Sequence, residues 1–86
     1  MTPEIPKEGP LETRLSECPK GSECLVKELV GPFRGRFSEM GLNPGIKIKI
    51  IDQAGINGPI IIQFRGYRLS IRKEEAYNII IKIINW

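Results

Sequence analysis

The sequence predicts an all-β domain, a closed or nearly closed small barrel of about five antiparallel strands with one short helix and one helical turn. Residues 46–50 and 67–72 alternate between apolar and polar side chains, as strands do when one face meets water. Glycine and proline separate the short segments, which is typical of sandwiches and small barrels. Closing a barrel would also hide the edges of strands as rich in isoleucine as these.

The predicted strands are short and separated by turn-forming residues. A break in the alternation at 27–28 predicts a bulge in the first strand. Pro59 stands at the start of the third strand, where proline is tolerated, and 65–66 forms a short reversal before the fourth. Residues 73–77 are predicted to form one polar helical turn before the last strand. The strands are expected at residues 24–30, 46–50, 60–64, 67–72 and 79–84.

The short helix is predicted between the first two strands. Its apolar face consists of three residues at helical spacing, Phe33, Phe37 and Met40. Gly41 is expected to end the helix in the left-handed conformation, with Leu42 folding back on the last turn. Residues 43–45, Asn-Pro-Gly, then match a type II turn, in which the glycine takes a positive φ.

The chain has 86 residues, which indicates a single domain. Residues 1–12 contain three prolines and a glycine, so we expect an extended or disordered N-terminal arm, followed by the barrel domain over 13–86. The N-terminus lacks the apolar region of a signal peptide. No apolar run approaches the ~18 residues that a spanning helix needs. We therefore expect a cytoplasmic protein that does not insert into the membrane.

The composition argues against an enzyme or a resident metal. Histidine is absent, which removes the usual general base near neutral pH and the commonest metal ligand. The carboxylates are scattered without ligand spacing, and no nucleophile is paired with a base. We expect the two cysteines, Cys18 and Cys24, to be reduced thiols, while a disulfide or a metal shared between chains remains open. No cofactor is expected.

An ordered set of short motifs is more specific than any one of them. The first half contains Leu15-Ser16-Glu17, Pro19-Lys20-Gly21, Glu39-Met40-Gly41-Leu42 and Pro44-Gly45. The second half contains Gly58-Pro59-Ile60, Arg65-Gly66-Tyr67-Arg68-Leu69-Ser70-Ile71-Arg72 and Glu74-Glu75-Ala76. In this order and at these spacings, the chain from about Leu15 to Ile83 resembles the ferrous iron transport protein A family, FeoA.

The resemblance implies an SH3-like barrel that assists FeoB, a membrane protein that imports Fe²⁺ and has a cytoplasmic GTP-binding domain. The expected function is therefore an accessory protein of ferrous iron uptake that binds the cytoplasmic part of an FeoB-like transporter. One alternative is a detached SH3-like domain of a metal-dependent repressor, although the chain has no helix-turn-helix. A small-barrel nucleic-acid binder is the other; the net charge of +3 gives it weak support, whereas the aromatic content of 7% argues against it. A weak homo-oligomer also remains open.

Arginines and a turn of fixed shape are the candidate partner-binding residues. We expect a patch at Arg34, Arg36 and the 41–45 turn, since arginine is enriched at interfaces. Reversing both helix arginines should weaken binding and leave the barrel folded. The second hairpin offers a further set, although solvated arginines would have the same pattern. The full candidate set is Arg34, Arg36, Met40, Gly41, Leu42, Pro44, Gly45, Arg65, Arg68 and Arg72.

Overall fold

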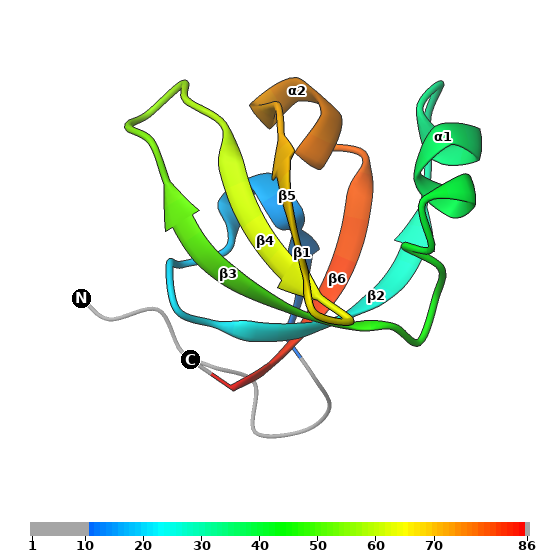
Figure 1. The fold of residues 1–86 in the computed structure, drawn as a ribbon, viewed down its shortest axis with the longest axis horizontal. Helices are drawn as coiled ribbons and strands as arrows, with labels where there is room; N and C mark the ends of the chain where they lie inside the picture. The colour runs from blue at the N-terminus through cyan, green and yellow to red at the C-terminus, as the bar shows by residue number, and fades with distance from the viewer. Residues whose placement is uncertain (1–10, 86) are drawn as a thin grey trace.

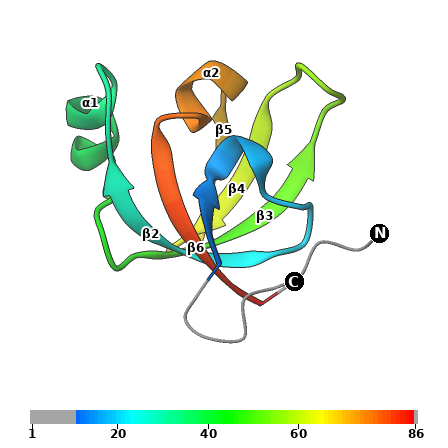
Figure 2. The same cartoon turned by 180° about the vertical axis from the view of Figure 1, so that it is seen from behind.

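One strongly curved antiparallel sheet carries the fold of residues 11–85, the part of the chain that the computed structural model describes. Its six strands lie in the order β1-β6-β2-β3-β4-β5. Figure 1 shows β4 and β5 on the near side, and Figure 2 shows β1 and β6 on the opposite side, so the sheet wraps around its own interior. The strands are β1 (Leu11–Arg14), β2 (Glu23–Leu29), β3 (Lys47–Gln53), β4 (Ile60–Phe64), β5 (Tyr67–Ile71) and β6 (Ile79–Asn85).

In the described part of the chain, three short helices lie between the strands. The 3₁₀ helix η1 (Leu15–Glu17) follows β1, α1 (Arg34–Glu39) follows β2, and α2 (Lys73–Ala76) follows β5. The predicted short helix and helical turn are thus confirmed as α1 and α2. No helix among residues 11–85 has both the length and the apolar character that crossing a bilayer requires.

All five expected strands are present, and β1 is a sixth that the sequence analysis missed. Leu11 and Glu12, which we assigned to the N-terminal arm, pair with Ile83 and Lys82 of β6. The strand is therefore stabilised by pairing with a segment distant in sequence, and no pattern in its own residues predicted it. The rest of the predicted arm lies outside the described residues.

The core consists of alternate strand side chains closed by two residues around α1. In β4 the buried side chains are Ile60, Ile62 and Phe64, which face the same side because strand side chains alternate. Phe37 of α1 and Leu42 after it are 1% and 0% exposed. Burying one such side chain stabilises the fold by about 2 kcal/mol, so α1 is held by packing despite its six residues.

The predicted bulge and helix end are confirmed. The β2–β6 register shifts between Val26 and Glu28, where the alternation breaks. Gly41 has φ +96°, and the Leu42 N–H donates to the Phe37 carbonyl at 3.0 Å, closing the last turn of α1. The type II turn is also present. Gly45 has φ +95°, and the N–H group of the residue after it donates to the carbonyl group of the residue that begins the turn.

Two tyrosines are exposed, and one of them stands at an apolar position of the alternating pattern in 67–72. Tyr67 was expected on the apolar face of β5 with Leu69 and Ile71, but its side chain is 70% exposed. It begins the strand at the hairpin tip, where no other element covers it, whereas Ile71 at the far end is buried. Tyr77, just after α2, is 53% exposed.

Candidate partner-binding surface

The turn between α1 and β3, residues 41–45, is fixed on both sides by hydrogen bonds. The Gly45 N–H donates to the Val26 carbonyl and the Val26 N–H donates to the Ile46 carbonyl, each at 2.8 Å, which anchors the turn to β2. On the helix side, the Ser38 hydroxyl donates to the side-chain carbonyl of Asn43 at 2.7 Å. The turn is therefore ordered before any partner arrives, and preorganised loops lose less entropy on binding.

A depression of about 360 Å³ lies on the α1 side of this turn. Arg34 at its rim is exposed and makes no ion pair among the described residues, and the half-buried Leu29 provides apolar surface. Glu28 also lines it, so the depression carries one charge of each sign. Its lining consists of Glu28, Leu29, Arg34, Gly35, Ser38, Asn43 and Pro44.

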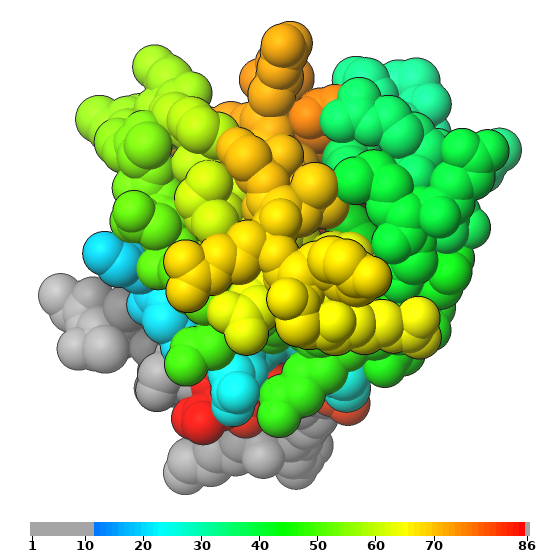
Figure 3. Space-filling view, viewed as in Figure 1, coloured from blue at the N-terminus to red at the C-terminus, as the bar shows by residue number. Residues whose placement is uncertain are grey.

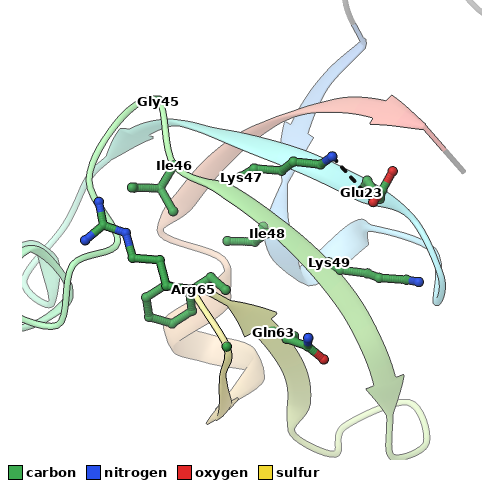
Figure 4. Close-up of a pocket in the computed structure, with 10 residues that line it drawn as sticks. Glu23, Gly45, Ile46, Lys47, Ile48, Lys49, Gln63 and Arg65 are labelled. Atoms are coloured by element: carbon green, nitrogen blue, oxygen red, sulfur yellow. Dashed lines mark ion pairs between the residues drawn. The ribbon is translucent and has the colours of Figure 1, made fainter.

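A second depression of about 450 Å³ lies on the other side of the turn, between the start of β3 and the β4–β5 hairpin. Figure 4 shows Arg65 extending toward Ile46, while Lys47 points to Glu23, with which it forms an ion pair at 3.6 Å. Lys49 makes no ion pair among residues 11–85. This depression is therefore more basic than the first.

The turn separates the two depressions, because Pro44 lines one and Gly45 lines the other. In Figure 3 the hairpin, in yellow, abuts the green segment that contains α1 and the turn. The two sets of candidate residues thus meet at Gly45 and Arg65. We call the exposed residues Arg34, Met40, Pro44, Gly45 and Arg65 the turn surface.

Arg36 has a structural role that the sequence analysis did not foresee. Its Nη1 lies 2.8 Å from Oε2 of Glu75, whose side chain is only 7% exposed. The other oxygen of Glu75 accepts the Arg72 backbone N–H at 3.2 Å. The ion pair joins α1 to α2, so reversing Arg36 would leave a buried carboxylate facing another carboxylate. Our expectation that both helix arginines can be reversed without cost to the fold therefore needs correction, and only Arg34 suits that test.

Two other candidate residues lie at the α1 end of the turn and face the core. Leu42 is fully buried, so it packs in the core and offers no surface to a partner. A methyl group on Gly41 would lie 3.8 Å from the ring of Phe64, which places the end of α1 directly over β4. Met40, by contrast, is 36% exposed and adds apolar area to the turn surface.

The arginines of the second hairpin do not lie together. Lys49, Gln63 and Arg68 are direct partners across β3, β4 and β5, so Arg68 continues the sheet face on which Lys49 lies. Arg72 lies at the opposite end of β5 from Arg65 and lines a separate depression. The sequence analysis missed Lys47 and Lys49 as candidates, although their alternation with buried isoleucines already indicated that they point outward.

The chemistry of this surface suits recognition of another molecule. It offers cationic side chains that are unpaired among residues 11–85, a rigid turn and modest apolar area, which together fit a protein surface that bears carboxylates. Within residues 11–85, no three acidic or thiol side chains are grouped closely enough to hold a metal ion. The pKa of Asp52, at the other end of β3, is lowered by the Gln53 N–H and by Lys20.

The family model for the FeoA domain matches residues 13–83. A fusion protein of Fe(2+) transport protein A and the Fe(2+) transporter FeoB from Porphyromonas gingivalis is 31% identical over 74 residues. The match covers 84% of this chain, and the chain spans 9% of the length of the fusion protein.

Solved structures agree with this match. An FeoA-like protein from Clostridium acetobutylicum is 31% identical with a TM-score of 0.79, covering 87% of this chain and 90% of that one. The FeoA of Stenotrophomonas maltophilia, a prokaryotic SH3 domain protein solved with zinc, is 20% identical with a TM-score of 0.73, covering 80% of this chain and 88% of that one. At that identity the likeness concerns the fold alone, which is SH3-like as the resemblance implied.

Proposed function

Because the chain belongs to the FeoA domain family, we propose that it is a cytoplasmic accessory protein of ferrous iron uptake that binds the cytoplasmic part of an FeoB-like membrane transporter. Proteins of this family are accessory or regulatory and not enzymes. The observation that carries the proposal is the relative in which an FeoA domain and FeoB form one polypeptide.

Such a fusion supports physical association of the two parts. Joining two modules in one chain raises the effective concentration of each near the other to the millimolar range, so even weak contacts are occupied. Contacts of this kind form most readily between surfaces that are ordered in advance and chemically complementary, because less entropy is lost on association.

The turn surface has these properties. Arg34 is exposed, uncommitted to any described carboxylate and adjacent to a depression of about 360 Å³. Arginine can pair with a carboxylate through two parallel hydrogen bonds, which gives direction as well as strength to a contact. Pro44 lines the same depression, and the partly exposed Met40 after α1 adds apolar area to the turn surface. We propose that an acidic patch of the transporter contacts Arg34 and extends over the turn toward Arg65.

A nucleic-acid-binding function has one feature in its favour, the basic face that includes Lys49, Arg65 and Arg68. Tyr67 is the exposed aromatic residue at the edge of this face. Binding of single strands needs several such rings in succession as well as unpaired cations. Lys47 is already paired with Glu23, and Phe64, whose ring lies beside that of Tyr67, is only 6% exposed. The protein-binding function is therefore the better supported of the two.

A charge reversal at Arg34 tests the proposed function. We expect Arg34→Glu to weaken binding to the purified cytoplasmic domain of the cognate transporter about tenfold or more, because ~1.4 kcal/mol of lost pairing corresponds to a factor of ten. Isothermal titration calorimetry at physiological salt measures the change. Arg34 is exposed and unpaired among the described residues, so the melting temperature should remain close to that of the wild type.

Lys20→Glu is the matched control, because it changes the net charge by the same amount. Lys20 lies before β2, at the end of that strand remote from α1, and its ion pair with Asp52 is between two exposed side chains. The affinity of the Lys20→Glu variant for the transporter domain should stay within about twofold of the wild-type affinity. Equal weakening by both variants would indicate a general charge effect and would remove Arg34 from the interface. Absence of binding by the wild type would overturn the proposed partner itself.

A further inference from the structure

The two cysteines, which the proposed function does not use, are in contact. The Cys18 Sγ lies 3.9 Å from the Cys24 Sγ, and both side chains are buried. Cys18 directly follows η1, and Cys24 lies in β2, where it pairs with Ile83 of β6 and Ile48 of β3. A disulfide requires the sulfur atoms to approach to ~2.05 Å. The remaining displacement is less than about 2 Å, which is within reach of a side-chain rotation.

The backbone around the pair is fixed, so the contact does not depend on a loose loop. The Gly21 N–H donates to the Ile50 carbonyl at 2.8 Å, and the Ile50 N–H donates to the Ser22 carbonyl at 2.9 Å. These two bonds hold the segment between the cysteines against β3. The Cys18 N–H in turn donates to the Leu15 carbonyl at 3.2 Å, at the end of η1.

The two thiols differ in their tendency to ionise. The hydrogen bond from the Cys18 thiol lowers the pKa of Cys24, because it stabilises the Cys24 thiolate. The same hydrogen bond, together with burial, raises the pKa of Cys18. The thiolate is the nucleophilic form, so this difference favours Cys24 as the first sulfur to react. Cys18, already in contact with it, is placed as the second sulfur.

We propose that Cys18 and Cys24 are a thiol oxidation site, at which a hydroperoxide forms an intramolecular disulfide that fastens η1 to β2. With hydrogen peroxide, the Cys24 sulfur attacks one oxygen, the O–O bond breaks, and one water leaves as a sulfenic acid forms. The Cys18 sulfur then attacks the Cys24 sulfur, so the S–S bond forms and the S–O bond breaks. The hydroxyl group leaves with the Cys18 proton as a second water. The two thiols lose two electrons and two protons in all, and the peroxide is reduced to two waters.

The bond would stabilise the folded state and leave the turn surface unchanged. A cross-link between Cys18 and Cys24 reduces the entropy of the unfolded chain, and because the loop that it closes is short, the stabilisation should lie toward the lower end of the range for disulfides. Both cysteines lie toward the end of the molecule away from α1, because β2 runs from Glu23 near them to Leu29 before the helix. Burial of both sulfurs implies slow oxidation, limited by local opening of the segment around η1.

Intact mass measurement on the full chain tests the proposal. The reduced protein is exposed to hydrogen peroxide, and its remaining thiols are alkylated after unfolding. We expect a species that takes up no alkyl group, is 2 Da lighter by loss of two hydrogens, and returns to two alkylated thiols after treatment with dithiothreitol. The oxidised form should melt about 5–15 °C higher than the reduced form.

Cys18→Ala and Cys24→Ala are the matched controls, since each removes one sulfur. With either variant, peroxide should give no monomer that is 2 Da lighter, and the melting temperature should not rise. The proposal fails if the folded wild-type protein keeps both thiols under conditions that oxidise the unfolded chain. It also fails if the disulfide links two chains, as a non-reducing gel would reveal. Neither outcome depends on these variants folding, because both are read from the wild type.

Discussion

At the scale of single residues, two arginines of the same short helix have different roles. Arg34 and Arg36 are both exposed residues of α1. The guanidinium group of Arg36 nevertheless pairs with the buried Glu75, whereas Arg34 is exposed at the rim of a depression. Removing the cation of an ion pair whose partner is buried costs more than removing the cation of an exposed pair, because a buried charge is left uncompensated. Exposure alone therefore does not identify which of the two is available to a partner.

Truncation of each arginine to alanine should separate these roles. We expect Arg36→Ala to lower the free energy of unfolding by about 1–2 kcal/mol, between the values for exposed and for buried pairs, since Arg36 itself is half exposed. Arg34→Ala should change it by less than about 0.5 kcal/mol. Urea denaturation followed by circular dichroism measures both. Equal stability of the two variants would show that the contact with Glu75 does not hold α1 to α2.

The sequence predicts which face of a strand a side chain takes better than it predicts which distant residue that side chain contacts. The alternation in 46–50 correctly separates buried isoleucines from exposed lysines, because it reports which face a side chain takes. The same pattern in 67–72 puts Tyr67 on the apolar face of its strand although it is 70% exposed, because alternation cannot show where the covering elements end. The pairing of Arg36 with Glu75 joins two helices that no local pattern relates. Contacts of this kind depend on tertiary structure.

At the scale of elements, the end of α1 shows how glycine sets the shape of the candidate site. Gly41 has φ +96°, a conformation that a side chain disfavours, and the hydrogen bond from Leu42 to Phe37 closes the helix over it. The chain then enters the turn that separates the two depressions. The conformation of one glycine thus determines the direction of the turn surface.

Alanine substitution at two glycines of this element should have opposite effects. Gly41→Ala places a side chain at positive φ and should destabilise the fold by about 1 kcal/mol. Gly35 lies inside α1, where an added Cβ meets nothing within 4 Å, so Gly35→Ala should stabilise it by about 0.5–1 kcal/mol. Thermal melts should therefore move in opposite directions. A shift of the same sign in both variants would contradict this account of the helix end.

The remaining elements divide by how local their signals are. The helix end, the type II turn and the β4–β5 reversal were predicted because glycine and proline act through their own backbone angles. The strand β1 was missed because its four residues are ordered by pairing with β6 near the opposite end of the chain. A pattern of four residues next to several prolines gives no sign of such a partner.

At the scale of the whole molecule, the strand order brings the candidate residues together. The turn precedes β3 and the hairpin follows β4, and the antiparallel pairing of these two strands places both at the same end of the sheet. Gly45 and Arg65 consequently line one depression, although the sequence analysis treated their segments as alternative sites. The strand register places Arg68 on the same sheet face as Lys49, and it leaves Arg72 at the opposite end of β5. The fold class was predictable from the sequence, whereas this juxtaposition required the sheet.

Mapping the interface on this chain tests the central claim most directly. Uniformly ¹⁵N-labelled protein is titrated with the unlabelled cytoplasmic domain of the cognate FeoB-like transporter, and amide chemical shifts are followed to saturation. The account predicts that shifts or line broadening concentrate at residues 34–45 and 63–66, while residues 19–22 and 54–58, at the other end of the sheet, remain unchanged. Unchanged spectra at saturating partner would contradict the proposed function, and changes centred on 19–22 or 54–58 would contradict the proposed surface.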